Sequence, residues 1–367
     1  MTRLALSLFS SLLFLLFTAS AASLALPPTT SPSNSSLTPR SLSQNCDCYL
    51  VSGEDPGYFT NYKLWDFRDV SLPPPSDPSS RWDSATIPLS QTPFAADWQA
   101  QSWAREKTID STIPLRNSPG NAFFANHPNA PGASQLVLRT TRLEDHASTA
   151  EIESRRGSYF HCSFRVRMRL MAREAITRDP EDTTPDVNDV PSGACAGIFT
   201  YRSATCEADL EFLTSDPPNT IHYANQPDYD PVSDEVIPGA AEVVTTVPVP
   251  WSMWTTHRMD WFPAETRWYA DGQLQANVSV SVPDQPSILA MNLWNDGGAW
   301  TGDMEIDESV YMGIEWIEVA YNASTAGLPS DETSQSFRLR SSEQARMDDG
   351  AELSCERPCY LDRMQYH

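Results

Sequence analysis

Residues 163–170, Ser-Phe-Arg-Val-Arg-Met-Arg-Leu, alternate polar and apolar side chains without interruption. A period of two is the spacing at which successive side chains of a strand point to opposite faces. The four apolar residues of this stretch share one face, and three arginines and a serine share the other. The pattern predicts a half-buried strand with its apolar face on a core.

Other strand patterns flank this stretch. They occur at residues 135–141 (QLVLRTT), 197–201 (GIFTY) and 313–321 (GIEWIEVAY), the last being apolar on both faces. An Asp-Gly pair at 271–272 follows an aromatic run and predicts a hairpin turn. Residues 172–191 are acidic, contain proline and predict a loop. Many short strands without a long amphipathic helix predict an all-β sandwich.

The composition is strongly acidic. The chain has 367 residues, and 25 Lys and Arg against 48 Asp and Glu give a formal net charge of -23. A nucleic-acid binder needs a basic surface, and anionic membranes attract basic segments, so neither is an expected partner. Hydrophobic residues make up 40% of the chain, which is enough for a packed core.

The two ends differ from the middle. Residues 1–21 combine Arg3, an apolar run and small residues at 19–21, which predicts a secretory signal peptide rather than a membrane anchor, since an anchor needs about 20 apolar residues. Residues 22–44, rich in Pro, Ser and Thr, predict a linker open to O-glycosylation. Residues 45–324 are the expected folded domain, and 325–367 an expected polar tail that is poorly ordered or held only by its cysteines.

Seven cysteines follow the predicted cleavage site, at positions 46, 48, 162, 195, 206, 355 and 359. In a secreted protein they are expected to form disulfides with one left over, and their spacing does not fix the connectivity. Cys46 and Cys48 lie near one end of the chain, and Cys355 and Cys359 near the other. We therefore state as a hypothesis that disulfides between these pairs clamp the two ends together. A zinc site is not expected, because no CxxC pair has a partner pair. Three Asn-X-Ser triplets, at Asn34, Asn277 and Asn322, are candidate glycan acceptors.

The candidate chemistry lies in residues 206–212, Cys-Glu-Ala-Asp-Leu-Glu-Phe. On a strand, Glu207, Asp209 and Glu211 would share one face, and the apolar residues Ala208, Leu210 and Phe212 would share the other. The outer glutamate Cα atoms would be about 13 Å apart. Side chains that lean together could approach the carboxyl separation of about 5–5.5 Å that a retaining glycosidase uses.

The spacing by itself is weak evidence. At this acidic content, three alternating acids arise on the order of once per chain by chance. Residues 303–307, Asp-Met-Glu-Ile-Asp, have the same alternation after a glycine-rich stretch, and we interpret them as a solvated strand start.

The surrounding sequence distinguishes residues 206–212 from residues 303–307. Residues 155–322 resemble family-16 glycoside hydrolases, the laminarinase and lichenase group, whose E-x-D-x-E motif lies on a strand of a concanavalin A-like jelly roll. Segments resembling the family's occur in the same order around Glu207-Ala208-Asp209-Leu210-Glu211. They are Phe199-Thr200-Tyr201, His222-Tyr223-Ala224-Asn225, residues 254–261, Trp268-Tyr269-Ala270-Asp271-Gly272 and Met291-Asn292-Leu293-Trp294.

The resemblance implies a role for each carboxyl group. Glu207 would be the nucleophile, Glu211 the general acid and base, and Asp209 the assisting carboxylate. The family often has an aromatic residue just before the motif, where this chain has Thr205 and Cys206, which leaves the substrate open. The parity of Cys206 places it on the core face as a structural residue.

Sugar rings stack on aromatic side chains, and their hydroxyls need polar partners. The candidate substrate-binding residues in the expected cleft are Tyr201, Tyr223, Asn225, Trp294 and Trp300. His257 is expected to be structural.

The sequence therefore predicts a secreted endo-β-glucanase that hydrolyses β-1,3 or mixed β-1,3/1,4 linkages with retention. A cell-wall transglycosylase of the same fold and a non-catalytic lectin-like protein remain alternatives, because fold does not decide function. A Ser-His-Asp hydrolase is not predicted, since a G-x-S-x-G elbow is absent. The expected partner is a β-glucan polysaccharide, the expected state a monomer, and the expected location extracellular or at the cell wall. No cofactor or catalytic metal is expected. Relatives carry a structural calcium ion, but no ligand set can be named here.

Overall fold

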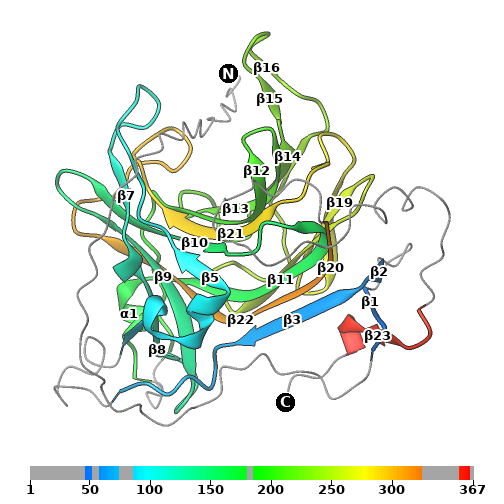
Figure 1. Ribbon diagram of the computed structural model, residues 1–367. Helices are drawn as coiled ribbons and strands as arrows, with labels where there is room; N and C mark the ends of the chain where they lie inside the picture. The colour runs from blue at the N-terminus through cyan, green and yellow to red at the C-terminus, as the bar shows by residue number, and fades with distance from the viewer. Residues whose placement is uncertain (1–45, 52–57, 74–85, 180–184, 325–354, 364–367) are drawn as a thin grey trace, which may run out of the picture.

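The computed structural model describes residues 46–51, 58–73, 86–179, 185–324 and 355–363. These residues form mainly strands, arranged in two large sheets packed face to face (Figure 1). The predicted signal peptide, the linker with Asn34 and most of the polar tail lie outside the described residues. Within the described ranges, no helix is long and apolar enough to cross a bilayer.

One sheet carries residues 206–213 and is called the acidic sheet below. Its antiparallel order is β5-β10-β21-β12-β13-β14-β17. The strands are β5 (Trp98–Ala100), β10 (Ala147–Ser154), β21 (Ile288–Trp294), β12 (Cys195–Ser203), β13 (Cys206–Leu213), β14 (Ile221–Gln226) and β17 (Ala241–Val244).

The other sheet is called the arginine sheet because its strand β11 (Tyr159–Met171) contains the three alternating arginines. Its order is β20-β19-β18-β11-β22, and β22 pairs on its far side with β3 and then β9. These strands are β20 (Gln273–Val278), β19 (Thr266–Ala270), β18 (Thr255–Trp261), β22 (Ser309–Ala323), β3 (Asn61–Asp66) and β9 (Ser134–Arg142). Beyond β9 lie β8 (Ala122–Asn126) and β4 (Ile87–Pro88).

The two sheets are continuous through β10. Its first residues, 147–149, pair with β9 and with β7 (Leu115–Asn117), while residues 150–154 pair with β21 and β5. β6 (Ala104–Arg105) extends β7. The smaller elements are β15 (Tyr229–Asp230), β16 (Glu235–Val236), α1 (Arg173–Ile176), η1 (Leu89–Gln91), η2 (Pro93–Ala96), η3 (Pro119–Asn121) and η5 (Leu361–Arg363). The predicted all-β jelly-roll sandwich is confirmed.

The main core lies between the sheets. It contains Phe164 and Met168 from the arginine sheet and Leu210 and Phe212 from the acidic sheet, together with large aromatic residues such as Trp98. Each of these side chains is at most 1% exposed. The alternation in β11 and β13 thus places one face of each strand in a common core, because a strand side chain can only point to one sheet face or the other.

The predicted strand at 163–170 is confirmed, but the expectation that it is half buried is wrong. Its arginine face is covered as well: Arg165 is 6% exposed and Arg169 is 2% exposed. Arg165 lies 2.9 Å from Asp362, and Arg169 lies 2.7 Å from Asp186. Acidic side chains from distant segments therefore compensate the burial of these charges, which would be costly if unpaired.

The other predicted strands are observed as β9, β12 and β22, and the Asp-Gly hairpin joins β19 to β20. Asp271 and Gly272 both have positive φ, 49° and 80°, as a two-residue hairpin turn with the type I′ twist requires. The described part of the 172–191 loop contains only the short helix α1. Residues 303–307 form an irregular segment and a turn before β22 rather than a strand start.

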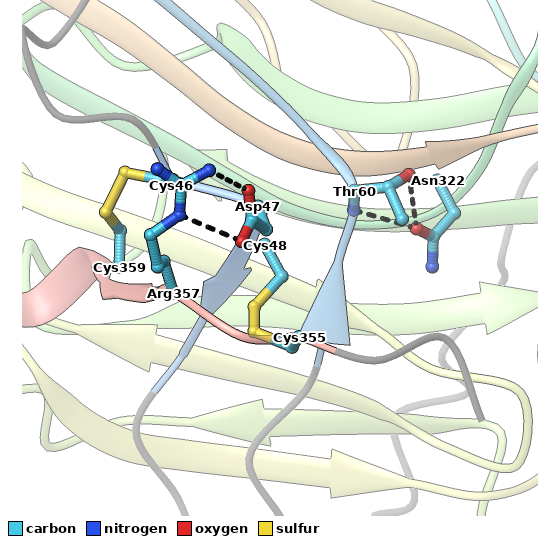
Figure 2. The surroundings of a disulfide bond; sticks show 8 residues. All are labelled: Cys46, Asp47, Cys48, Thr60, Asn322, Cys355, Arg357 and Cys359. Carbon is cyan, nitrogen blue, oxygen red and sulfur yellow. Dashed lines mark hydrogen bonds and ion pairs between the residues drawn. A yellow bond between two sulfur atoms is a disulfide. The ribbon is translucent and has the colours of Figure 1, made fainter.

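The two ends of the domain are joined on the outer side of the arginine sheet. Cys46 bonds to Cys359 and Cys48 bonds to Cys355, so the hypothesised clamp is present (Figure 2). β1 (Cys48–Leu50) pairs in parallel with β23 (Pro358–Tyr360) and antiparallel with β2 (Tyr58–Phe59). We call these paired segments and their two disulfides the terminal clamp.

Contacts beyond the disulfides hold the terminal clamp in place. Arg357 forms a bidentate pair with Asp47, with distances of 2.7 and 3.1 Å. Leu361 is buried with Val51 and Phe59 against Ala320 of β22. The segment 355–363 of the predicted polar tail is therefore ordered by packing as well as by its cysteines.

His257 on β18 is a buried titratable residue in the inter-sheet core. It is 1% exposed, its ring packs edge-on against Phe212 at 4.7 Å, and neither ring nitrogen has a hydrogen-bond partner among the described residues. Burial lowers the pKa of His257 to about 3. The folded protein therefore keeps this ring neutral, as expected for a structural histidine.

This burial makes folding stability sensitive to acid. Between the unfolded pKa near 6.5 and the folded value, only the unfolded chain binds the proton, so stability falls as pH falls. The contribution is about 2 kcal/mol lost by pH 5 relative to neutral pH. We expect His257→Leu to lose less stability than wild type between pH 7.5 and pH 5 in urea denaturation. Met259→Leu, a non-titrating change on the same strand, should keep the wild-type difference; an unchanged difference in His257→Leu would contradict the prediction.

Candidate active site

Strand β13 divides its side chains between the core and the outer face of the acidic sheet. Ala208, Leu210 and Phe212 are buried in the inter-sheet core, each at most 1% exposed. Glu207, Asp209 and Glu211 therefore lie on the opposite face, where the two glutamates are half-buried and Asp209 is 7% exposed. The three predicted carboxyl groups thus share one face, as the alternation indicated.

The neighbouring strands supply the surroundings of these carboxyl groups. On β12, Tyr201, Phe199 and Gly197 lie opposite Glu207, Asp209 and Glu211, respectively. On β14 the opposing residues are Gln226, Ala224 and His222, in the same order. Because directly paired residues share a sheet face, these side chains line the acidic face together with the carboxyl groups.

Glu211 has the most hydrogen-bond donors around it. The thiol of Cys195 donates to its Oε1 at 3.4 Å, and the Trp300 side chain also hydrogen-bonds its carboxyl group. The ring of Trp300 packs edge-on against His222 at 5.0 Å, and Nε2 of His222 lies 2.7 Å from Asp216. Hydrogen bonds from Cys195 and Trp300 therefore both restrain the Glu211 carboxyl group.

Asp209 has a weaker partner, since the amide of Gln226 donates to its Oδ2 at 3.4 Å. Burial, followed by the charges of Glu207 and Glu211, raises the pKa of Asp209 well above its usual range. The pKa of Glu207 is also raised well above its usual range, first by burial and then by Glu211, Glu151 and Asp228. The group consequently resists full ionisation, because neighbouring negative charges in a desolvated site repel one another.

Glu211 differs from the other two. Burial raises its pKa to about 7, while the hydrogen bonds from Cys195 and Trp300 act in the opposite direction. A carboxyl group of this kind holds a proton in mildly acidic solution and can still release it. That property suits a general acid that later acts as a base.

A second acidic pair on this face was missed from the sequence. Glu151 and Glu153 of β10 pair with Asn292 and Ala290 of β21, whose other neighbours are Gly197 and Phe199 of β12. The indole of Trp103 donates to Glu151 at 2.8 Å. Burial raises the pKa of Glu151 to about 8. The signal was the alternation in Glu151-Ile152-Glu153, which gains meaning only once β10 is known to lie in the acidic sheet.

Three of the five predicted substrate-binding residues lie near the carboxyl groups. Tyr201 is opposite Glu207, Trp300 hydrogen-bonds Glu211, and Trp294 of β21 pairs with Cys195 on the same face. All three aromatic side chains are half-buried. The guanidinium of Arg105 lies 5.8 Å from the Trp294 ring centroid, so one cation borders the acidic face at this end.

Tyr223 and Asn225 do not lie on this face, which corrects the expectation that they line a cleft. Tyr223 is 1% exposed and its ring lies 5.6 Å from that of Trp268 in the inter-sheet core. Asn225 is fully buried, and its amide donates to the carbonyl of Val280 at 3.0 Å. The two share strand parity as predicted, but they share the core face, because His222 and Gln226 occupy the acidic one.

The described residues contain no group of three or more His, Cys, Asp or Glu side chains arranged to hold a metal ion. Three cysteines in the described residues, Cys162, Cys195 and Cys206, are free and buried, so the expectation of a single left-over cysteine is wrong. Cys206 is 4% exposed, in keeping with its predicted place on the core side.

Comparison with known proteins matches no family model. The curated relatives include the beta-glucanase of Paenibacillus polymyxa, 25% identical over 140 residues that are 36% of this chain and 55% of that protein. The beta-glucanase of Bacillus amyloliquefaciens is 27% identical over 136 residues, 34% of this chain and 52% of the relative. The chain thus spans about half the length of these relatives. The sequence resemblance to family-16 enzymes is confirmed.

The Bacillus licheniformis beta-glucanase aligns with a TM-score of 0.46 at 18% identity and covers 65% of this chain and 97% of its own. A family-16 endo-glucanase from Bacteroides ovatus aligns with a TM-score of 0.45 at 13% identity, covering 64% and 98%.

The opposite orientations of Asn225 and Gln226 predict different stability effects. Asn225→Ala removes a fully buried amide that satisfies a backbone carbonyl, and we expect a loss of about 1–3 kcal/mol in urea denaturation. Gln226→Ala changes the half-buried neighbour on the acidic face, whose hydrogen bonds to Asp209 and to the Asp228 backbone N–H are only part-buried, and should cost less, about 1 kcal/mol or under. Equal losses in the two variants would contradict the core placement of Asn225.

Proposed function

We propose that the protein is a secreted retaining endo-β-glucanase that hydrolyses β-1,3 or mixed β-1,3/1,4 linkages. The observation that carries this proposal is the group Glu207, Asp209 and Glu211 on one face of β13, with the pKa of Glu211 raised to about 7. Double displacement needs one ionised and one protonated carboxyl group close together. The resemblance to beta-glucanases supports the choice of substrate.

In the first step, a carboxylate oxygen of Glu207 attacks the anomeric carbon, and the bond to the leaving oxygen breaks. Glu211 donates its proton to that oxygen, so the shortened polymer leaves as a neutral alcohol and Glu211 becomes ionised. In the second step, Glu211 takes a proton from water, whose oxygen attacks the anomeric carbon and releases Glu207. Asp209, between the two, contributes negative charge that opposes loss of the proton from the group.

The surrounding side chains fit a carbohydrate. The half-buried aromatic residues Tyr201, Trp294 and Trp300 offer ring faces and edges on which sugar C–H groups can stack. Glu151, Gln226 and Asn292 offer polar groups for hydroxyls on the same face. The net charge of -23 suits a neutral polymer better than an anionic one.

Location outside the cell is part of this proposal. The two disulfides of the terminal clamp are the support in the described residues, because such bonds persist in oxidising compartments. Residues 1–21, which carry the signal-peptide prediction, lie outside the described ranges.

Replacing either glutamate tests the assignment. We expect Glu207→Gln and Glu211→Gln to lower kcat on laminarin or lichenan by at least about 10³-fold, because each removes a group that takes part in bond exchange. Reducing-end release measures this, and proton NMR of the first product should show the β-anomer. Glu305→Gln, at an exposed acid of the 303–307 segment, is the matched control and should keep wild-type activity.

Other results would favour one of the alternative functions or contradict the assignment. Longer oligosaccharide products instead of new reducing ends would identify a transglycosylase. Binding without any turnover in wild type would identify a lectin-like protein. Activity retained in both glutamine variants would contradict the carboxylate assignment.

The raised pKa of Glu211 predicts an alkaline limit. A general acid works only while protonated, so kcat/KM should fall about tenfold per pH unit above a midpoint of about 7. An aryl oligoglucoside, whose phenolate leaves without protonation, should retain its rate of glycosyl-enzyme formation above this pH. The same fall for both substrates would mean that a different group sets the limit.

A further inference from the structure

Cys195 occupies an unusual position for a buried thiol. It begins β12 on the acidic face, pairs with Trp294 of β21 and is 0% exposed. Its Sγ lies 3.4 Å from Oε1 of Glu211 and donates a hydrogen bond to it. The thiol therefore contacts the carboxyl group that the proposed function makes the general acid and base.

The register explains why the contact is made by Cys195. The residue directly opposite Glu211 on β12 is Gly197, which has no side chain to donate. A Cβ at Gly197 would lie 2.7 Å from Oδ1 of Asn292, so a larger residue there would need a shift of Asn292. The next side chain on this face of β12 is Cys195, two residues away and diagonal to Glu211.

The other groups around Glu211 are Trp300, His222 and a set of carboxyl groups. Trp300 also hydrogen-bonds the Glu211 carboxyl, and it packs against His222 of β14, whose Nε2 is engaged by Asp216. The charged groups facing Glu211 are Asp209 and Glu207 on its own strand and Asp228 beyond β14. From β21 the facing side chains, Asn292 and Trp294, are uncharged.

We propose that Cys195 is a positioning residue for Glu211: its thiol occupies Oε1 of the carboxyl group and so directs Oε2 for proton transfer. This inference rests on the proposed function. A carboxylic acid can donate only from its protonated oxygen, so the thiol donor at Oε1 favours the proton on Oε2. The orientation of the acid is then set before the substrate binds. Such preorganisation of a proton donor increases the rate of proton transfer.

The thiol can serve throughout the working pH range. Burial, and then the charge of Glu211, raises the pKa of Cys195 well above its usual value. The group therefore stays protonated and remains a donor whether Glu211 is neutral or ionised. An S–H donor binds an anion more strongly than a neutral oxygen, so its removal should favour the protonated form of Glu211.

Three variants test this role by kinetics. Cys195→Ala should lower kcat about 2- to 10-fold with KM little changed, and move the alkaline limit of kcat/KM upward by about half a pH unit. Cys195→Ser, which keeps a donor, should recover most of kcat and the wild-type limit. Cys162→Ala removes another fully buried free thiol, one that lies in the inter-sheet core, and should leave kcat and the limit unchanged. Wild-type kcat and pH dependence in Cys195→Ala would overturn the proposal.

A second measurement does not depend on glucanase activity. The infrared S–H stretching band of Cys195, identified by its loss in Cys195→Ala, should shift as pH passes through about 7 in wild type and stay fixed in Glu211→Gln. A band that does not respond to pH in wild type would overturn the contact itself. A responsive band in a protein that cleaves no glucan would instead overturn the proposed function, and the positioning role with it, while the contact would stand.

Discussion

The burial of Ala208, Leu210 and Phe212 in the inter-sheet core is the constraint on which the candidate site depends. A strand offers only two faces, so filling one with apolar side chains leaves the other to Glu207, Asp209 and Glu211. The pairing of β13 with β12 and β14 then decides which groups meet each carboxyl. A shift of one residue in β13 would move its acids into the core and its apolar groups outward. Burial of three unpaired carboxyl groups in an apolar core would strongly destabilise the fold.

The electrostatics follow from the same arrangement. Five carboxyl groups from β10 and β13 share one sheet face, and desolvation is the first cause of the raised pKa of each one. Three buried or partly buried arginines of β11, Arg165, Arg167 and Arg169, lie in the other sheet, where they pair with acids of their own. These three cations are thus separated from the acidic face by the thickness of the sandwich. Burial and mutual repulsion therefore raise the pKa values of these carboxyl groups, so the group keeps part of its protons in mildly acidic solution.

Much of this arrangement was predictable because β13 and β11 have strong contrast between alternate residues. The segment His222-Tyr223-Ala224-Asn225 lacks that contrast, since each face carries at least one aromatic or polar side chain. Parity alone could show that Tyr223 and Asn225 lie together, but not on which side; the pairing of His222 with Glu211 decides it. The roles of Glu151 and Cys195 depend on strands far apart in sequence becoming neighbours, which no local pattern reveals. The buried arginine face of β11 was hidden for the same reason, because its acidic partners come from distant segments.

The terminal clamp closes the polypeptide into a covalent ring. Cys48 and Cys355 are 307 residues apart in sequence, and the backbone between them contains both large sheets. A single cut anywhere along that backbone by a protease would open the ring without releasing a fragment, because the disulfides would still hold both pieces together. The ring is joined on the arginine sheet, where Asp362 reaches Arg165, and the carboxyl groups lie on the opposite sheet. A molecule nicked once in a loop would therefore still migrate as one chain until its disulfides were reduced.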